Sequence, residues 1–133
     1  MIFLAASVLL AAEDTDNREH EASLALLRTG DLATIDLALY ETTNVAITRW
    51  RDPAAAGRVR ERVWTIAELG TLVRVDRRLG EDIATLSAES GLSSYDAAYV
   101  VGARGLGAVL ASCDRRDLVD VGLAQLPTAL AGP

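Results

Sequence analysis

The sequence predicts one α/β domain over residues 1–133, with a small, mostly parallel sheet that is flanked by helices on both faces. The first observation behind this prediction is the alternation of short apolar runs with longer segments of helical periodicity, which is typical of parallel sheets covered by helices. The second is composition. Of the 133 residues, 50% are hydrophobic, which is enough for one buried core and too many for a disordered chain.

The chain begins with a run of apolar and small residues from Ile2 to Ala12. We interpret this run as a first buried strand near Ile2–Leu4, followed by a helix that Ser7 caps. A secreted or membrane-anchored protein is the alternative, and it requires residues 1–12 to be absent from the mature chain. A secretory leader carries basic residues ahead of its apolar run, whereas Met1 stands there alone. The run is also shorter than the roughly 20 residues that cross a bilayer, so we expect no membrane partner.

Caps, glycines and the spacing of apolar residues predict the remaining elements in order. They are helices over 16–30, 36–50 and 53–70, strands over 32–35 and 71–75, helices over 76–91 and 93–107, a strand over 108–112 and a last helix over 113–125. Pro53 suits a first helical turn and Gly91 a helix end. Ser93 and Asp96 have the spacing of a capping box, with Asp where Glu or Gln is usual.

Cysteine and histidine usage limits the chemistry. The chain has one cysteine, Cys113, and one histidine, His20, so neither an internal disulfide nor a zinc site of thiolates and imidazoles can form. Any metal must therefore be held by oxygen ligands. We expect Cys113 to be an ordinary half-buried residue and His20 a solvated one, and the lone cysteine suits a reducing cytoplasm.

Acidic residues recur where strands end or the following helices begin. Asp114 directly follows the strand at 108–112, Asp96 lies in the first turn of its helix, and Glu41 lies about one turn inside another helix. Ligands of parallel sheets gather at the carboxyl ends of the strands. Carboxylates brought together there repel one another unless a divalent cation lies among them. Asp96 as a simple capping acid and Glu41 as a solvated helix residue remain alternatives.

Four segments of the chain together resemble a known family. They are, in order, ASVLLAA, YETTNV, GLSSYDAAYVVGA and LASCDRRDL. The pattern resembles the PIN-domain ribonucleases, in particular the toxins of VapBC-type toxin–antitoxin pairs, and it covers nearly the whole chain. The resemblance implies an endoribonuclease that depends on Mg²⁺ or Mn²⁺, a cognate antitoxin, an RNA substrate and a homodimer.

The resemblance also implies the site residues. Glu41, Asp96 and Asp114 match the acidic residues of the family, as catalytic residues and metal ligands. Asp117 matches a further acid found in many members, and Ser112 matches the small hydroxyl residue before the last aspartate.

Ala5 departs from the family pattern. The first strand normally ends in an aspartate, so IFLDAS would be expected where the chain reads IFLAAS. Either a natural protein has lost a metal ligand, or Asp was replaced by Ala to make a toxic protein expressible. In both cases we expect the chain as written to be an impaired nuclease. The alternative function is a naturally degenerate, non-catalytic PIN domain that binds antitoxin or RNA.

Arginine supplies every basic residue of a chain whose net charge is -6. A group of them around Trp50 could contact RNA phosphates, but a solvated helix face is the simpler interpretation. The members of this group are Arg49, Arg51, Arg58, Arg60 and Arg62. Arg115 and Arg116 adjoin Asp114 and are better candidates for phosphate contacts. The apolar helices near the N-terminus and Trp64 could serve a dimer interface or the antitoxin.

Overall fold

The sheet is parallel and has four strands. The computed structural model describes residues 1–132 and places the strands β1 (Ile2–Leu4), β2 (Leu32–Ile35), β3 (Thr71–Val73) and β4 (Val109–Ala111) in the order β3-β2-β1-β4. Phe3 pairs with Ala33 on one side and with Leu110 on the other. The predicted α/β fold is therefore confirmed, and each pairing between these strands is parallel.

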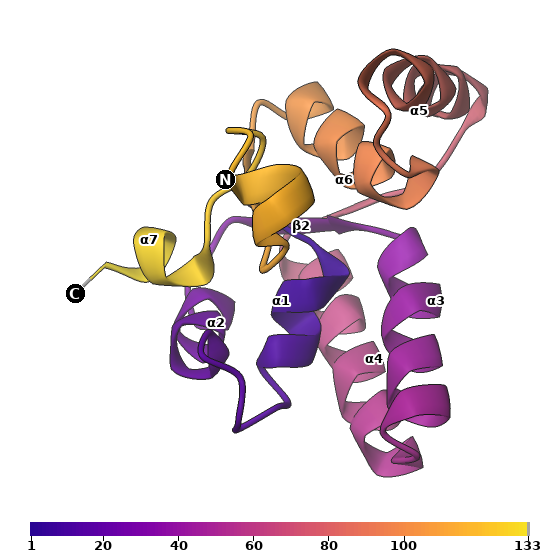
Figure 1. Cartoon of the computed structure of the whole chain (residues 1–133). Helices are drawn as coiled ribbons and strands as arrows, with labels where there is room; N and C mark the ends of the chain where they lie inside the picture. The colour runs from indigo at the N-terminus through magenta and orange to yellow at the C-terminus, as the bar shows by residue number, and fades with distance from the viewer. Residues whose placement is uncertain (133) are drawn as a thin grey trace.

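Helices cover both faces of this sheet (Figure 1). They are α1 (Ala6–Ala11), α2 (His20–Leu27), α3 (Leu37–Asn44), α4 (Pro53–Leu69), α5 (Arg77–Ser90), α6 (Ser94–Gly105) and α7 (Pro127–Ala131), with short π-helical segments η1 (Val45–Arg49) and η2 (Arg115–Val119). Helix α6 packs on the sheet with α5 outside it, while α1, α3 and α4 lie on the opposite face. The predicted layers are therefore present.

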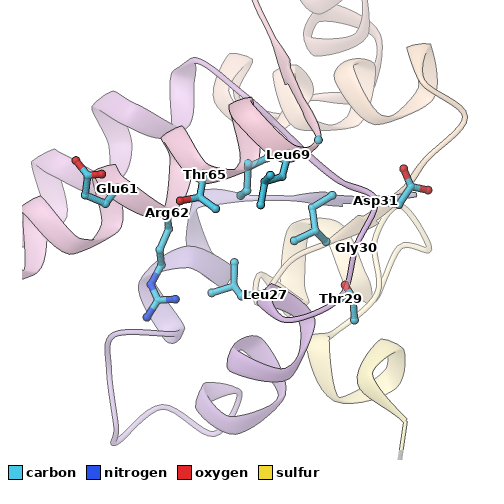
Figure 2. A pocket seen from close by; sticks show the side chains of 11 residues that line it. Leu27, Thr29, Gly30, Asp31, Glu61, Arg62, Thr65 and Leu69 are labelled. Carbon is cyan, nitrogen blue, oxygen red and sulfur yellow. The ribbon is translucent and has the colours of Figure 1, made fainter.

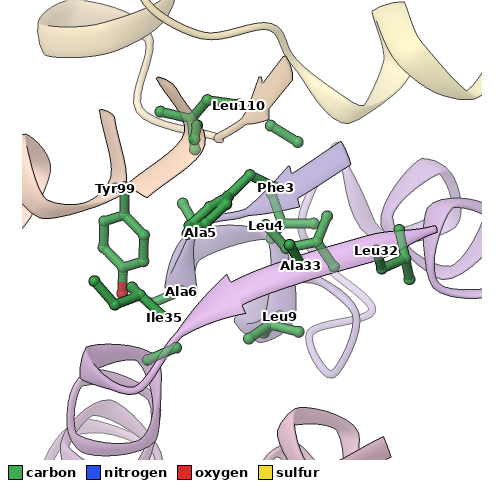
Figure 3. Packing of buried hydrophobic residues seen from close by; sticks show 14 of the residues in the cluster. Phe3, Leu4, Ala5, Ala6, Leu9, Leu32, Ala33, Ile35, Tyr99 and Leu110 are labelled. Atoms are coloured by element: carbon green, nitrogen blue, oxygen red, sulfur yellow. The ribbon is translucent and has the colours of Figure 1, made fainter. Parts of the chain in front are cut away.

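The first strand passes through the centre of the core. Phe3 and Leu4 are fully buried, and Figure 3 shows Phe3 lying among Ala5, Leu110 and the residues of β2. Gly102 of α6 allows this close packing, because a Cβ there would lie 2.7 Å from Cζ of Phe3. The apolar N-terminal run thus forms β1 and α1, as its composition predicts. Among the described residues, no helix combines the length and apolar character needed to cross a bilayer.

Several predicted helix ends are confirmed. Pro53 begins α4, and Gly91 follows α5 in a left-handed conformation with φ +76. Ser93 caps α6, because its Oγ accepts a hydrogen bond of 3.1 Å from the backbone N–H of Asp96.

The prediction of a single last helix over 113–125 is wrong. The described chain has the five-residue segment η2, then a turn and a single bridge residue at Gln125, and then the short helix α7. Gly122 ends the first part, because its φ of +81 is incompatible with a continuing right-handed helix. Pro127 then begins α7, where a missing backbone N–H costs nothing.

Two predictions for the N-terminal helices are also wrong. Ser7 does not cap α1, which begins after Ala5, because the Ser7 Oγ instead accepts a hydrogen bond from the backbone N–H of Cys113. His20 is not a solvated side chain. It is 14% exposed, and its Nδ1 lies 2.8 Å from the carbonyl oxygen of Ala11.

Candidate metal centre

Three aspartates meet at the carboxyl edge of the sheet. Asp96 comes from the first turn of α6, Asp114 precedes η2, and Asp117 lies within η2. One carboxylate oxygen of each lies within 4.8 Å of the others. All three side chains are partly exposed, so both solvent and a ligand can reach them.

Hydrogen bonds at the start of η2 fix this arrangement. The carboxylate of Asp114 accepts a hydrogen bond of 3.0 Å from the backbone N–H of Asp117. The Oγ of the buried Ser112 accepts another, also of 3.0 Å, from the backbone N–H of Asp114. Asp114 therefore caps η2 and lies in the same turn as Asp117, and Ser112, directly after β4, holds that turn in place.

Helix α1 is tied to the same turn through Cys113. The backbone N–H of Cys113 donates a hydrogen bond to the Ser7 Oγ at 2.9 Å, and the Cys113 thiol lies 3.7 Å from the Ser7 carbonyl oxygen. Burial raises the pKa of the thiol to about 11, so the thiolate is scarce at neutral pH. Cys113 is half-buried, as expected, and it serves the structure of the edge.

Glu41 lies near Asp96 but outside the group of three aspartates, and a tyrosine holds its carboxylate. The hydroxyl of Tyr99, a residue that is 3% exposed, donates a hydrogen bond of 2.8 Å to Oε1 of Glu41. Glu41 is close enough to Asp96 for their charges to repel. The sequence prediction missed Tyr99, although its position three residues after Asp96 on one helix places both on the same face.

The electrostatics of the edge disfavour full ionisation. Burial raises the pKa of Asp96, and repulsion from Asp114 and Asp117 raises it further. Burial also raises the pKa of Glu41, and the hydrogen bond from Tyr99 opposes that rise. A bound cation would relieve this repulsion.

The three aspartates fit a hard divalent cation. Two oxygens bound to one ion through bonds of roughly 2.0 to 2.6 Å lie no more than about 4 to 5 Å apart, which matches the cluster. Carboxylates are the ligands that Mg²⁺ and Mn²⁺ prefer.

Ala5 occupies the matching end of the central strand. Its backbone N–H donates a hydrogen bond of 3.0 Å to the carbonyl oxygen of Ala111, three residues before Asp114. The residue is 4% exposed, and its methyl group contributes to the core (Figure 3). The alanine side chain offers no ligand atom for a cation.

A hollow of about 270 Å³ lies elsewhere, between α2 and α4. Figure 2 shows Leu27, Leu69 and Arg62 around it. Its floor includes Leu32, the first residue of β2, so it opens at the amino edge of the sheet, away from the three aspartates.

The arginines near Trp50 are partly engaged in ion pairs. Arg58 and Arg62 both contact the carboxylate of Glu13, at 2.6 and 2.9 Å, and that side chain is 6% exposed. These contacts join the end of α1 to α4. The prediction of a solvated helix face for this group does not include the ion pairs of Arg58 and Arg62 with Glu13, a residue far away in the sequence.

The comparisons with known proteins agree with this architecture. The model of the family described as PIN domain matches residues 2–122. No protein of curated function matched the sequence.

Solved structures with the same fold include three from different organisms. VapC20 of Mycobacterium tuberculosis, a toxin that cleaves the sarcin-ricin loop, has a TM-score of 0.75 and 19% identity over 92% of this chain and 95% of its own. A toxin-antitoxin complex from Klebsiella pneumoniae has a TM-score of 0.71 and 15% identity, over 96% of this chain and 98% of its own. PAE2754 of Pyrobaculum aerophilum has a TM-score of 0.69 and 26% identity, over 98% of this chain and 85% of its own.

The family match spans most of the chain, and the fold is shared with toxin structures over nearly their full length. The sequence resemblance to this family is confirmed. The chain belongs to the PIN domain family.

Proposed function

We propose that the chain is the toxin of a type II toxin–antitoxin pair, with the site of an endoribonuclease that depends on Mg²⁺ or Mn²⁺. The convergence of Asp96, Asp114 and Asp117 within 4.8 Å carries this proposal, because cutting a phosphodiester with a metal needs carboxylates gathered from separate segments. The shared fold with VapC20, a toxin that cleaves the sarcin-ricin loop, supports it.

In this proposal Asp96, Asp114 and Asp117 hold the metal, and Glu41 completes the site from α3. The metal, when bound, would lower the pKa of a coordinated water and stabilise charge on the scissile phosphate. Tyr99 keeps the Glu41 carboxylate in one orientation through its hydrogen bond. Arg115 and Arg116, both exposed beside the cluster, supply positive charge for the RNA backbone.

Ala5 impairs this site, because position 5 lies at the same edge and provides a methyl group instead of a carboxylate. We expect metal to bind less tightly and to be placed less well. The same observation favours a second candidate, a non-catalytic PIN domain that binds antitoxin or RNA. Whether the alanine is natural or introduced decides between the two.

The partners follow from the same proposal. The Klebsiella pneumoniae structure is a toxin-antitoxin complex, which supports a cognate antitoxin for this chain. Tyr40, Ile47 and Trp64 expose apolar surface around a hollow beside α3 and α4, and this surface supports a homodimer or an antitoxin contact. A toxin acting on cellular RNA would work in the cytoplasm.

The experiment is cleavage of a structured RNA pool in Mn²⁺, for the chain as written and for variants with Ala5→Asp and Asp96→Asn. We expect Ala5→Asp to cleave RNA, EDTA to abolish the cleavage, and Asp96→Asn added to Ala5→Asp to abolish it again. A variant with Ala5→Asp that binds metal but leaves RNA intact would refute the nuclease and favour the non-catalytic domain.

A further inference from the structure

A second hollow, of about 520 Å³, adjoins the three aspartates. It lies between the loop that joins α5 to α6 and the segment that follows η2. Asp96 and Asp117 belong both to the aspartate cluster and to its wall. A group bound in this hollow would therefore be a direct neighbour of a phosphate held at the cluster.

The wall of the hollow combines apolar and polar groups. Leu92, Val121 and Leu123 supply the apolar part, and Val121 is 60% exposed although it is hydrophobic. Asp96, Asp117 and Arg116 supply the polar part. This volume lies in the range typical of small-ligand sites, which are mostly apolar with a few fixed polar groups.

Arg116 is available for a planar ligand. Its side chain is 90% exposed, and it pairs with the adjacent Asp117 through contacts of 3.2 and 3.4 Å. Such an exposed pair is weak and can rearrange. A guanidinium group stacks well on flat aromatic rings.

We propose that this hollow is a nucleobase subsite, which receives the base of the RNA nucleotide next to the scissile phosphate. A base has two apolar faces and polar edges, so it matches a wall that combines the apolar Leu92 and Val121 with the guanidinium group of Arg116. The hollow at the amino edge does not suit this task, because the strands separate it from the aspartates. The inference rests on the proposed function and names how that site would hold its substrate.

The test uses nucleosides, which carry neither phosphate nor a cleavable bond. Adenosine, uridine and, as a control for the sugar, D-ribose are titrated into the ¹⁵N-labelled chain without metal. We expect adenosine or uridine to shift the amide signals of Gly91, Leu92 and Leu123, and ribose to leave them in place. Val121→Glu should weaken this binding by about fivefold or more, because it places a charged carboxylate where the apolar face of the base would lie.

Val109→Glu is the matched control, since Val109 is also an exposed valine but lies at the start of β4, at the opposite edge. It should bind nucleosides like the parent chain. Shifts no larger than those with ribose, or equal affinity in Val121→Glu and the parent, would overturn the subsite. Because the assay needs no metal and no catalysis, this result is distinguishable from a failure of RNA cleavage, which would overturn the proposed function alone.

Discussion

At the scale of single residues, Tyr99 determines how the Glu41 carboxylate is held. Its hydroxyl is the hydrogen-bond donor that opposes the effect of burial on Glu41. Tyr99→Phe should therefore raise the pKa of Glu41 further, and should lower the free energy of unfolding by about 1 kcal/mol. A ¹³C titration of the Glu41 carboxyl measures the first effect, and urea unfolding measures the second. Tyr95→Phe, at an exposed tyrosine on the same helix, is the control, and an equal response of the two variants would contradict the role of Tyr99.

Asp96 should reduce stability at neutral pH when no metal is present. Its pKa is raised in the folded protein, so the folded state binds the proton more tightly than the unfolded chain, and stability falls as pH rises through the shifted pKa. Asp96→Asn should then increase the free energy of unfolding near neutral pH, by less than about 1 kcal/mol because the group is partly exposed and screened.

The gain from Asp96→Asn should shrink as pH falls below the ordinary aspartate range, where both states are protonated. Urea unfolding at neutral and at acidic pH compares it with Asp82→Asn, a change at an exposed residue of α5. No gain at neutral pH, or a gain that persists in acid, would count against the repulsion described for the cluster.

The sequence alone identifies the acids that the fold gathers, but not how they are supported. Asp96 and Asp114 stand out because they adjoin a helix start and a strand end, and the structure brings them together. Tyr99 and Ser7 do not stand out, because a tyrosine or serine in an apolar helix is also typical of ordinary packing. Their partners are 58 and 106 residues away, so only the tertiary structure reveals the hydrogen bonds.

At the scale of elements, α7 is docked by one buried acid. The carboxylate of Glu19, a residue that is 5% exposed, accepts hydrogen bonds from the backbone N–H and the hydroxyl of Thr128. These bonds join the start of α2 to the start of α7, and Figure 1 shows the two helices side by side. The C-terminal segment is therefore tied to the domain at a specific point.

Glu19→Gln should loosen α7, because a neutral amide makes weaker hydrogen bonds with Thr128 than the charged carboxylate does. We expect a loss of about 1 to 3 kcal/mol in the free energy of unfolding and faster hydrogen exchange at the Thr128 amide. Glu21→Gln, at a side chain that is 91% exposed, should change neither. If Glu19→Gln leaves the Thr128 exchange rate unchanged, the docking role is wrong.

Element prediction succeeds where local chemistry decides and fails where distant contacts decide. The ends of α4 and α5 follow from Pro53 and Gly91, whose backbone preferences act within one turn. The start of α1 and the division of the last helix depend on the Ser7 bond to Cys113 and on the break at Gly122. Residues 113–125 have a helical pattern of apolar residues, but Asp114 and Gly122 confine regular structure to one short segment.

At the scale of the whole molecule, the net charge of -6 is misleading about partners. For the proposed RNA substrate, three clustered aspartates would repel the phosphate, so the proposed binding at that edge would depend on a cation. Arg115 and Arg116 lie next to the cluster and offset part of its charge. Average charge therefore says less about nucleic-acid binding than the placement of the acids.

We also expect the isolated chain to form a homodimer. The family resemblance implies one, and Tyr40, with 75% of its surface exposed, and Ile47 leave apolar area uncovered on the described surface. Sedimentation velocity over a dilution series measures the state directly. A monomer at a concentration on the order of tens of micromolar, without antitoxin, would contradict this prediction.

We propose above that the carboxyl edge of the sheet is a divalent-metal site in which position 5 lacks one acid. Calorimetric titration of Mn²⁺ into the parent chain, Ala5→Asp and the equally sized Ala5→Asn tests it most directly. We expect Ala5→Asp to bind Mn²⁺ more tightly than either other chain, by a factor on the order of 10 to 100, because a carboxylate joins the three aspartates. Equal Mn²⁺ affinity in all three chains would contradict the claim.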